Sequence, residues 1–135
     1  MIGQHEILIA QNNTTTGTIG FSCSFSGMQS MEVRNMSKMI EKSEYTKILK
    51  LLDSGNNAEK YLAVLVLEKF EKLNKIEKMK VFEIYNSKEL VFVCAGCTYQ
   101  KGIPLHILFS ENGNFGWRET TLRWLEREFE KSDNL

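Results

Sequence analysis

The chain has 135 residues, 42% of them apolar and 25% charged, which is typical of one water-soluble domain of ordinary size. Its 17 basic and 17 acidic residues cancel, and this balance argues against the basic surplus that DNA, RNA or an acidic membrane surface attracts. The longest apolar run, Tyr61 to Leu67, is far shorter than the roughly 20 residues of a membrane-spanning helix.

Residues 1–27 differ in composition from the rest of the chain. The sequence EILIAQNNTTTGTIGFSCSFSG is rich in Thr, Ser, Asn and Gly and carries little charge. Its NNTTTG stretch is typical of a turn between two β-compatible runs. We therefore expect either a β-hairpin or an irregular, extended segment, since an isolated hairpin is only marginally stable in water.

Residues 28–131 have the spacing of a helical body, and residues 132–135 are expected to form a frayed tail of the same single domain. Ser43 is predicted to be the N-cap of a helix, and Gly55 is predicted to be its left-handed C-cap. The helix between them has one apolar face, which consists of Tyr45, Ile48, Leu49 and Leu52.

Two further helices are predicted next. The first follows an N-cap at Asn57 and has the sequence AEKYLAVLVLEKFEKLNK. It is apolar on nearly all sides, so we expect neighbouring elements to cover both of its faces. The second runs from about Lys75 to Tyr85, and its apolar face consists of Ile76, Met79, Phe82 and Tyr85.

The C-terminal third combines ambiguous and clear patterns. Leu90 to Val93 fits either a buried strand or a helix. Lys101 to Pro104 is expected to be a loop, in which Pro104 opens a short helix that carries Leu105, Leu108 and Phe109. The last helix is predicted over Arg118 to Lys131.

The stretch LLDSGNNAEKYLAVLVLEKF resembles the junction between the two helices of a HEAT-like (armadillo-type) repeat, over about residues 38–85. In that family an apolar helix ends at Leu-x-Asp and a polar turn follows. The second helix then carries small or aliphatic residues at paired spacings, here Ala58, Leu62, Ala63, Val66 and Leu67. No second copy with a clear period is visible. The resemblance implies a mainly α fold, a small stack of helix pairs, and a scaffold that binds other proteins.

The CAGC sequence, Cys94 to Cys97, is the one conspicuous chemical motif. A structural zinc site needs four ligands, and the set available here is Cys94, Cys97, His106 and Cys23. A thiol-redox pair is the other chemical interpretation. We favour a third one, in which these are small buried residues at a close contact, because free cysteine is among the most buried residue types. An odd number of cysteines also fits reduced thiols better than a disulfide framework.

The sequence contains neither a nucleophile elbow nor a phosphate-binding loop, and no leader pattern is visible at its start. We therefore expect a cytoplasmic, non-catalytic protein–protein interaction module of the adaptor or immunity type, without a cofactor. Its expected partner is another protein, not nucleic acid or a membrane. The alternative is a zinc-binding or thiol-redox protein. Trp, Tyr and Arg dominate binding hot spots, so the candidate contact residues are Trp117, Trp124, Arg118, Tyr61 and Tyr85.

Overall fold

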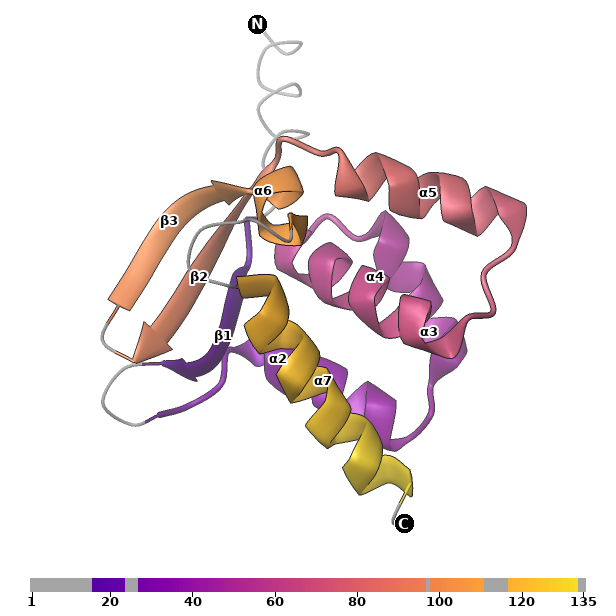
Figure 1. The fold of residues 1–135 in the computed structure, drawn as a ribbon, viewed down its shortest axis with the longest axis horizontal. Coiled ribbons are helices and arrows are strands. Elements are labelled where there is room, and N and C mark those ends of the chain that lie inside the picture. Colours follow the sequence, from indigo (N-terminus) through magenta and orange to yellow (C-terminus); the bar gives the residue numbers. More distant parts are fainter. Residues whose placement is uncertain (1–15, 24–26, 97, 111–116, 134–135) are drawn as a thin grey trace, which may run out of the picture.

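The computed structural model describes residues 16–23, 27–96, 98–110 and 117–133, and most of them are helical (Figure 1). The helices are α2 (Met31–Glu41), α3 (Tyr45–Lys50), the 3-10 helix η1 (Leu51–Asp53), α4 (Asn57–Phe70), α5 (Lys75–Tyr85), α6 (Leu105–Phe109) and α7 (Trp117–Asp133). The strands are β1 (Thr18–Cys23), β2 (Leu90–Gly96) and β3 (Thr98–Pro104). The predicted fold class, mainly α with a strand in the N-terminal segment, is confirmed. In the described ranges, each helix is too short or too polar to cross a membrane.

Helix α4 lies at the centre of the core. Ala58 and every residue from Tyr61 to Leu67 are at most 3% exposed. Helices α2, α3 and α5, the 3-10 helix η1 and strand β2 all pack against α4, which lies between α5 and α3 in Figure 1. The prediction of a helix that is covered on both faces is confirmed.

The bounds of α4 differ from the predicted ones. Asn56 is the N-cap in place of Asn57, and its side chain accepts a hydrogen bond from a backbone amide of the first turn. Asn57 is buried, and its Nδ2 donates to the carbonyl oxygen of Leu90 at 3.1 Å, which joins α4 to β2. The helix ends at Phe70 because Glu71 takes the left-handed conformation, with φ of 55°.

The helix before α4 has the predicted face and different caps. Ser43 has φ of 53° and lies in the turn, and Glu44 is the N-cap without a side-chain hydrogen bond. Gly55 is not left-handed, because α3 continues into the 3-10 helix η1, whose C-cap is an extended Ser54. The predicted apolar face is confirmed. Ile48 and Leu52 are buried, and Tyr45 and Leu49 are partly buried.

The other helices agree with their predictions. Helix α5 has the predicted bounds, and α6 follows Pro104 with its three apolar residues buried. Helix α7 begins at Trp117, one residue before the predicted start, and ends at Asp133.

The three strands form one sheet in the order β1-β2-β3. β1 runs parallel to β2, and β3 is antiparallel to β2. Ile19 pairs in register with Val93, and both side chains are buried. Among the described residues the neighbour of β1 is β2, which comes from far along the chain, whereas the hairpin considered for residues 1–27 would pair two local strands. The other half of that hairpin lies in residues 1–15, outside the described ranges.

For two segments of the sheet, the prediction from the sequence was ambiguous or wrong. Leu90 to Val93 begins β2 and is a strand, not a helix. Lys101 to Pro104, predicted to be a loop, is the second half of β3. Its glycine and proline suggested a loop. However, Gly102 lies where the β2–β3 register is irregular, with φ of +71°, and Pro104 ends an edge strand. Sheets accept these two residue types at such positions.

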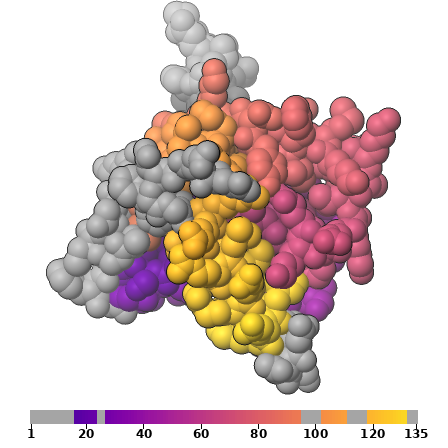
Figure 2. All heavy atoms as spheres, viewed as in Figure 1, coloured from indigo at the N-terminus to yellow at the C-terminus, as the bar shows by residue number. Residues whose placement is uncertain are grey.

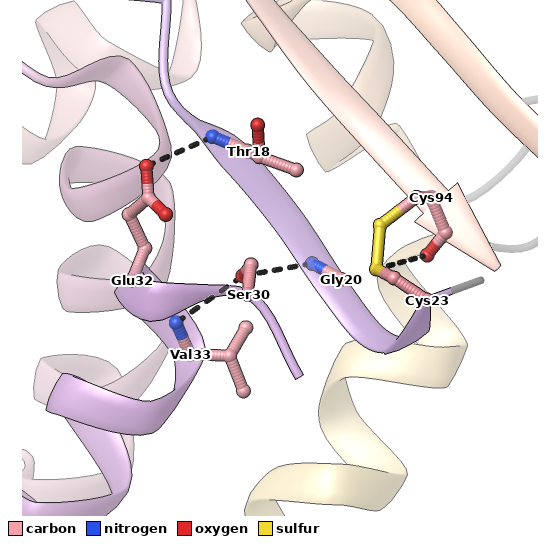
Figure 3. The surroundings of a disulfide bond; sticks show 7 residues. All are labelled: Thr18, Gly20, Cys23, Ser30, Glu32, Val33 and Cys94. Carbon is pink, nitrogen blue, oxygen red and sulfur yellow. Dashed lines mark hydrogen bonds between the residues drawn. A yellow bond between two sulfur atoms is a disulfide. The ribbon is translucent and has the colours of Figure 1, made fainter. Parts of the chain in front are cut away.

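The start of α2 fastens β1 to the helical body (Figure 3). The Ser30 hydroxyl is the N-cap and accepts hydrogen bonds from the Val33 amide at 3.4 Å and the Gly20 amide at 3.1 Å. A carboxylate oxygen of Glu32 accepts from the Thr18 amide at 3.0 Å. The same oxygen also accepts from the Asn56 side chain at 3.1 Å, so Glu32 joins β1, α2 and the start of α4.

We expect Glu32→Ala to lower the free energy of unfolding by about 1–2 kcal/mol, because two partly buried donors lose their acceptor. Urea denaturation followed by circular dichroism measures the change. The matched control is Glu41→Ala at the exposed end of the same helix, which should change stability by less than about 0.5 kcal/mol. Equal losses in the two variants would contradict the role of Glu32.

Candidate functional site

Two of the five candidate contact residues are core residues. Tyr61 and Trp124 are buried, with Trp124 packed against the ring of Phe21 at 5.3 Å between centroids. The Tyr61 hydroxyl is hydrogen bonded to the Thr121 hydroxyl at 3.0 Å, which joins α4 to α7. The side chain of Trp117 lies outside the described residues. A binding surface of this protein must therefore consist of residues other than Tyr61 and Trp124.

Three of the candidate residues meet around Phe109. Its ring contacts those of Tyr61 and Tyr85, with centroids 4.8 and 4.3 Å away. The Arg118 guanidinium donates from Nη1 to the Phe109 carbonyl oxygen at 3.0 Å. These contacts pack α4, α5, α6 and α7 together. The cluster explains why the sequence carries aromatic residues at these positions without requiring a ligand.

The two tyrosines of this cluster are poor acid–base catalysts. Burial raises the pKa of Tyr61 to about 12, although the Thr121 hydrogen bond and the Arg118 charge oppose the shift. Burial also raises the pKa of Tyr85, and its hydrogen bond to the Glu68 carboxylate acts in the same direction. A catalytic tyrosine needs a pKa close to the working pH. Both phenols are therefore neutral at physiological pH, which fits a structural role.

Cys23 and Cys94 form a disulfide between β1 and β2 (Figure 3). Their Cα atoms are 5.5 Å apart, within the usual range for this bond. The expectation of reduced thiols, which rested on the odd number of cysteines, is therefore wrong for these two residues. Gly20 lies beside the bond, and a Cβ atom at that position would collide with both sulfur atoms. The one sequence feature that relates to this pairing is the glycine at position 20. It could not be interpreted before the register of β1 and β2 was known.

The CAGC interpretation changes accordingly. Cys94 is buried, as the packing interpretation predicts, but its sulfur bonds to Cys23 and not to a neighbour in the motif. Zinc binds thiolates, so these two sulfur atoms are not available as ligands while the disulfide is intact. The Nδ1 of His106 lies 3.2 Å from the Ser87 carbonyl oxygen. Cys97 lies outside the described residues. Within the described ranges, no three His, Cys, Asp or Glu side chains converge on a possible metal position.

An exposed apolar stripe on α5 is the feature that sequence reasoning missed. It consists of Ile76, Met79 and Phe82, which are 68%, 59% and 70% exposed. All three belong to the apolar face that was predicted for this helix, together with Tyr85. The inward residues are instead Val81 and Ile84, at 8% and 7% exposed. Both sets have helical spacing, so periodicity alone did not distinguish them.

Helix α5 lies at the margin of the molecule (Figures 1 and 2), and the stripe is on its exposed side. Lys75 and Glu83 flank it and are both exposed. Two hollows border α5, with volumes of about 350 and 370 Å³. The larger one is lined by the charged residues Glu68, Glu71 and Lys78 and by the apolar residues Leu67, Leu73 and Val81. The helix is therefore accessible along much of its length.

The other hollow is lined by two lysines that are paired with carboxylates, and the exposed Glu83 lines it as well. Lys80 Nζ is 2.8 Å from an Asp53 carboxylate oxygen, and Lys60 Nζ is 3.7 Å from one of Glu89. Each lysine is thus offset by a carboxylate, and the four side chains form two separate pairs. Such an arrangement supplies neither an activated nucleophile nor a free anion site.

A comparison of the chain with known protein families, curated proteins and solved structures finds no match.

We expect Cys23→Ser to lower the free energy of unfolding by about 2–4 kcal/mol, because the bond closes a loop of 71 residues. Thermal unfolding and urea denaturation of the oxidised protein measure the loss. Wild-type protein treated with dithiothreitol should show a similar loss, whereas the reductant should have little effect on the variant. A wild-type stability that does not change on reduction would contradict a structural role for the disulfide.

Proposed function

We propose that this chain is a non-catalytic protein-binding module and that it binds its partner through the α5 stripe, Ile76, Met79 and Phe82. The observation that supports this proposal is the exposure of three large apolar side chains on one side of one helix. Single exposed apolar residues are common on protein surfaces, but a contiguous row usually marks a contact site. The spacing i, i+3 and i+6 brings the three side chains together along the helix.

The packing of α5 supports the same proposal. Its inner side already fills the core through Val81 and Ile84, so the outer side is left exposed by the described part of the chain. Water around the stripe is displaced only when another surface covers it, and this displacement favours association. The pair of an aromatic residue and a flexible methionine also suits adaptable recognition, since Phe and Met are enriched in interface cores.

The arrangement of α3, α4 and α5 agrees with a scaffold role. We propose that these helices are the HEAT-like part of the chain, with α4 as the shared inner helix. The support for this is the burial of α4 on all sides and the contact of α3 and α5 with it. Stacks of helix pairs present extended surfaces for binding other proteins. An adaptor or an immunity-type protein would use α5 in this way.

The proposed location follows from the disulfide. The cytoplasmic expectation rested on reduced thiols, and the Cys23–Cys94 bond removes that support. Disulfides of this structural kind form and persist in oxidising compartments. We therefore propose that the protein works in such a compartment.

The redox state of Cys23 and Cys94 in cells tests this location. We expect both residues to resist alkylation by N-ethylmaleimide that is added to intact cells before lysis, because their sulfur atoms are bonded to each other. Peptide mass spectrometry measures the modified fraction. Alkylation of both residues in intact cells would favour the cytoplasm instead.

The α5 proposal is tested by capture of binding partners on immobilised protein. We expect Phe82→Asp to weaken capture at least roughly tenfold, because a carboxylate replaces the most exposed apolar side chain of the stripe. The bait is kept at nanomolar concentration, and bound proteins are quantified by mass spectrometry. Circular dichroism and the melting temperature confirm that the variant is folded.

The matched control is Met31→Asp. Met31 is 64% exposed at the start of α2, away from the stripe, and a carboxylate is well tolerated in the first turn of a helix. Partners that are lost with Phe82→Asp should be kept with Met31→Asp. Partners that both variants keep, or that both lose equally, would contradict binding through α5.

A further inference from the structure

We propose that the α5 stripe also binds a second copy of this chain weakly, with the two α5 helices antiparallel about a two-fold axis at Met79. This inference rests on the proposed function, because it names an occupant of the same surface. The helix lies at the margin of the molecule with its stripe exposed, so another copy can approach it (Figures 1 and 2).

The apolar residues are arranged symmetrically about Met79. Around a two-fold axis, each residue before Met79 in one copy lies opposite the residue at the same distance after Met79 in the other copy. Ile76 is three positions before Met79 and Phe82 is three positions after it. Ile76 of each copy therefore packs against Phe82 of the other, and the two Met79 side chains meet at the axis. The stripe of one copy therefore covers the stripe of the other when the axis is at Met79.

The charges next to the stripe have the same symmetry with opposite sign. Lys75 is four positions before Met79 and Glu83 is four positions after it, so both lie on the side of the helix that carries the stripe. Both are exposed, and neither forms an ion pair with another residue in the described part of the chain. In the antiparallel pair, each Lys75 ammonium lies opposite a Glu83 carboxylate, which gives two attractive contacts.

The same charges oppose the other orientation. In a parallel pair, Lys75 would lie beside Lys75 and Glu83 beside Glu83, and like charges at close range disfavour association. A different protein would need to carry this order of acidic, apolar and basic residues on a surface of its own. This chain already carries the complementary order on α5, and this is why a second copy is the occupant we propose.

The size of the surface sets the expected strength of the pair. Helix α5 has 11 residues, so its outer side is about 16 Å long. Interfaces of weak, transient complexes bury less than about 1,200 Å² in total, and a contact of this length belongs to that class. We therefore expect dimers to become visible at concentrations on the order of 100 µM and to dissociate at nanomolar concentrations.

Sedimentation velocity of the purified full chain tests the pair. The concentration series reaches roughly several hundred micromolar, above the expected dissociation constant. The wild type should change from monomer to dimer. Lys75→Glu and Glu83→Lys should each weaken the association roughly tenfold, because each converts both attractive contacts into repulsive ones. The double variant, with the two charges exchanged, should dimerise like the wild type.

A mixture of the two single variants gives the most specific outcome. The acidic face of Lys75→Glu complements the basic face of Glu83→Lys, so an equimolar mixture should form dimers at concentrations where each variant alone is monomeric. The matched control exchanges charges on α2, with Lys38→Glu and Glu41→Lys, which are exposed and away from the stripe. These control variants should dimerise like the wild type, singly and mixed. Melting temperatures verify that every variant is folded.

The inference is overturned if the wild type remains monomeric over the whole series. It is also overturned if dimers form but the α5 charge variants leave them unchanged, or if the mixture does not restore them. These failures are distinct from a failure of the proposed function, because the capture experiment runs at nanomolar concentration, where the dimer is dissociated. A monomeric chain whose captured partner is lost with Phe82→Asp would keep the proposed function and reject the second copy as its occupant.

Discussion

The burial of α4 on every side is the constraint on which the rest of the fold depends. From Tyr61 to Leu67 this helix has no polar face, so it must be shielded from water all round. Helices α2, α3 and α5, with η1 and β2, provide that cover. Each of them contributes one apolar side to the same inner helix. Helix α5 is unusual among them because its outer side is apolar too. The proposed function rests on this exposed apolar side.

Strand β1 is held to this core at both of its ends. At its start the Glu32 carboxylate accepts from the Thr18 amide, and at its end Cys23 is bonded to Cys94. Between these points the Ser30 hydroxyl accepts from the Gly20 amide, while β2 supplies the ladder on the other edge. The strand's own side chains add to this, because Ile19 is buried in the core and Phe21 packs against Trp124.

The sequence predicted those features whose signals are local. Helix α5 and the face at Ile48 and Leu52 follow from spacing, and the burial of α4 follows from composition. The pairing of β1 with β2 was not predictable, because two distant strands share no local pattern. The sequence also did not show which of Phe82 and Val81 is the exposed residue of α5. Both positions are apolar and helical, and only the packing of neighbouring elements distinguishes them.

The parallel pairing of β1 with β2 also orders the events of folding. Helices α2 to α5 lie between the two strands in the sequence and contact one another, so they can begin to pack while β1 is still unpaired. At a synthesis rate of about 5–20 residues per second, the 71 positions from Cys23 to Cys94 correspond to roughly 4–14 s. During this interval Cys23 remains a thiol without its partner, and the edge of β1 is open to strands of other chains.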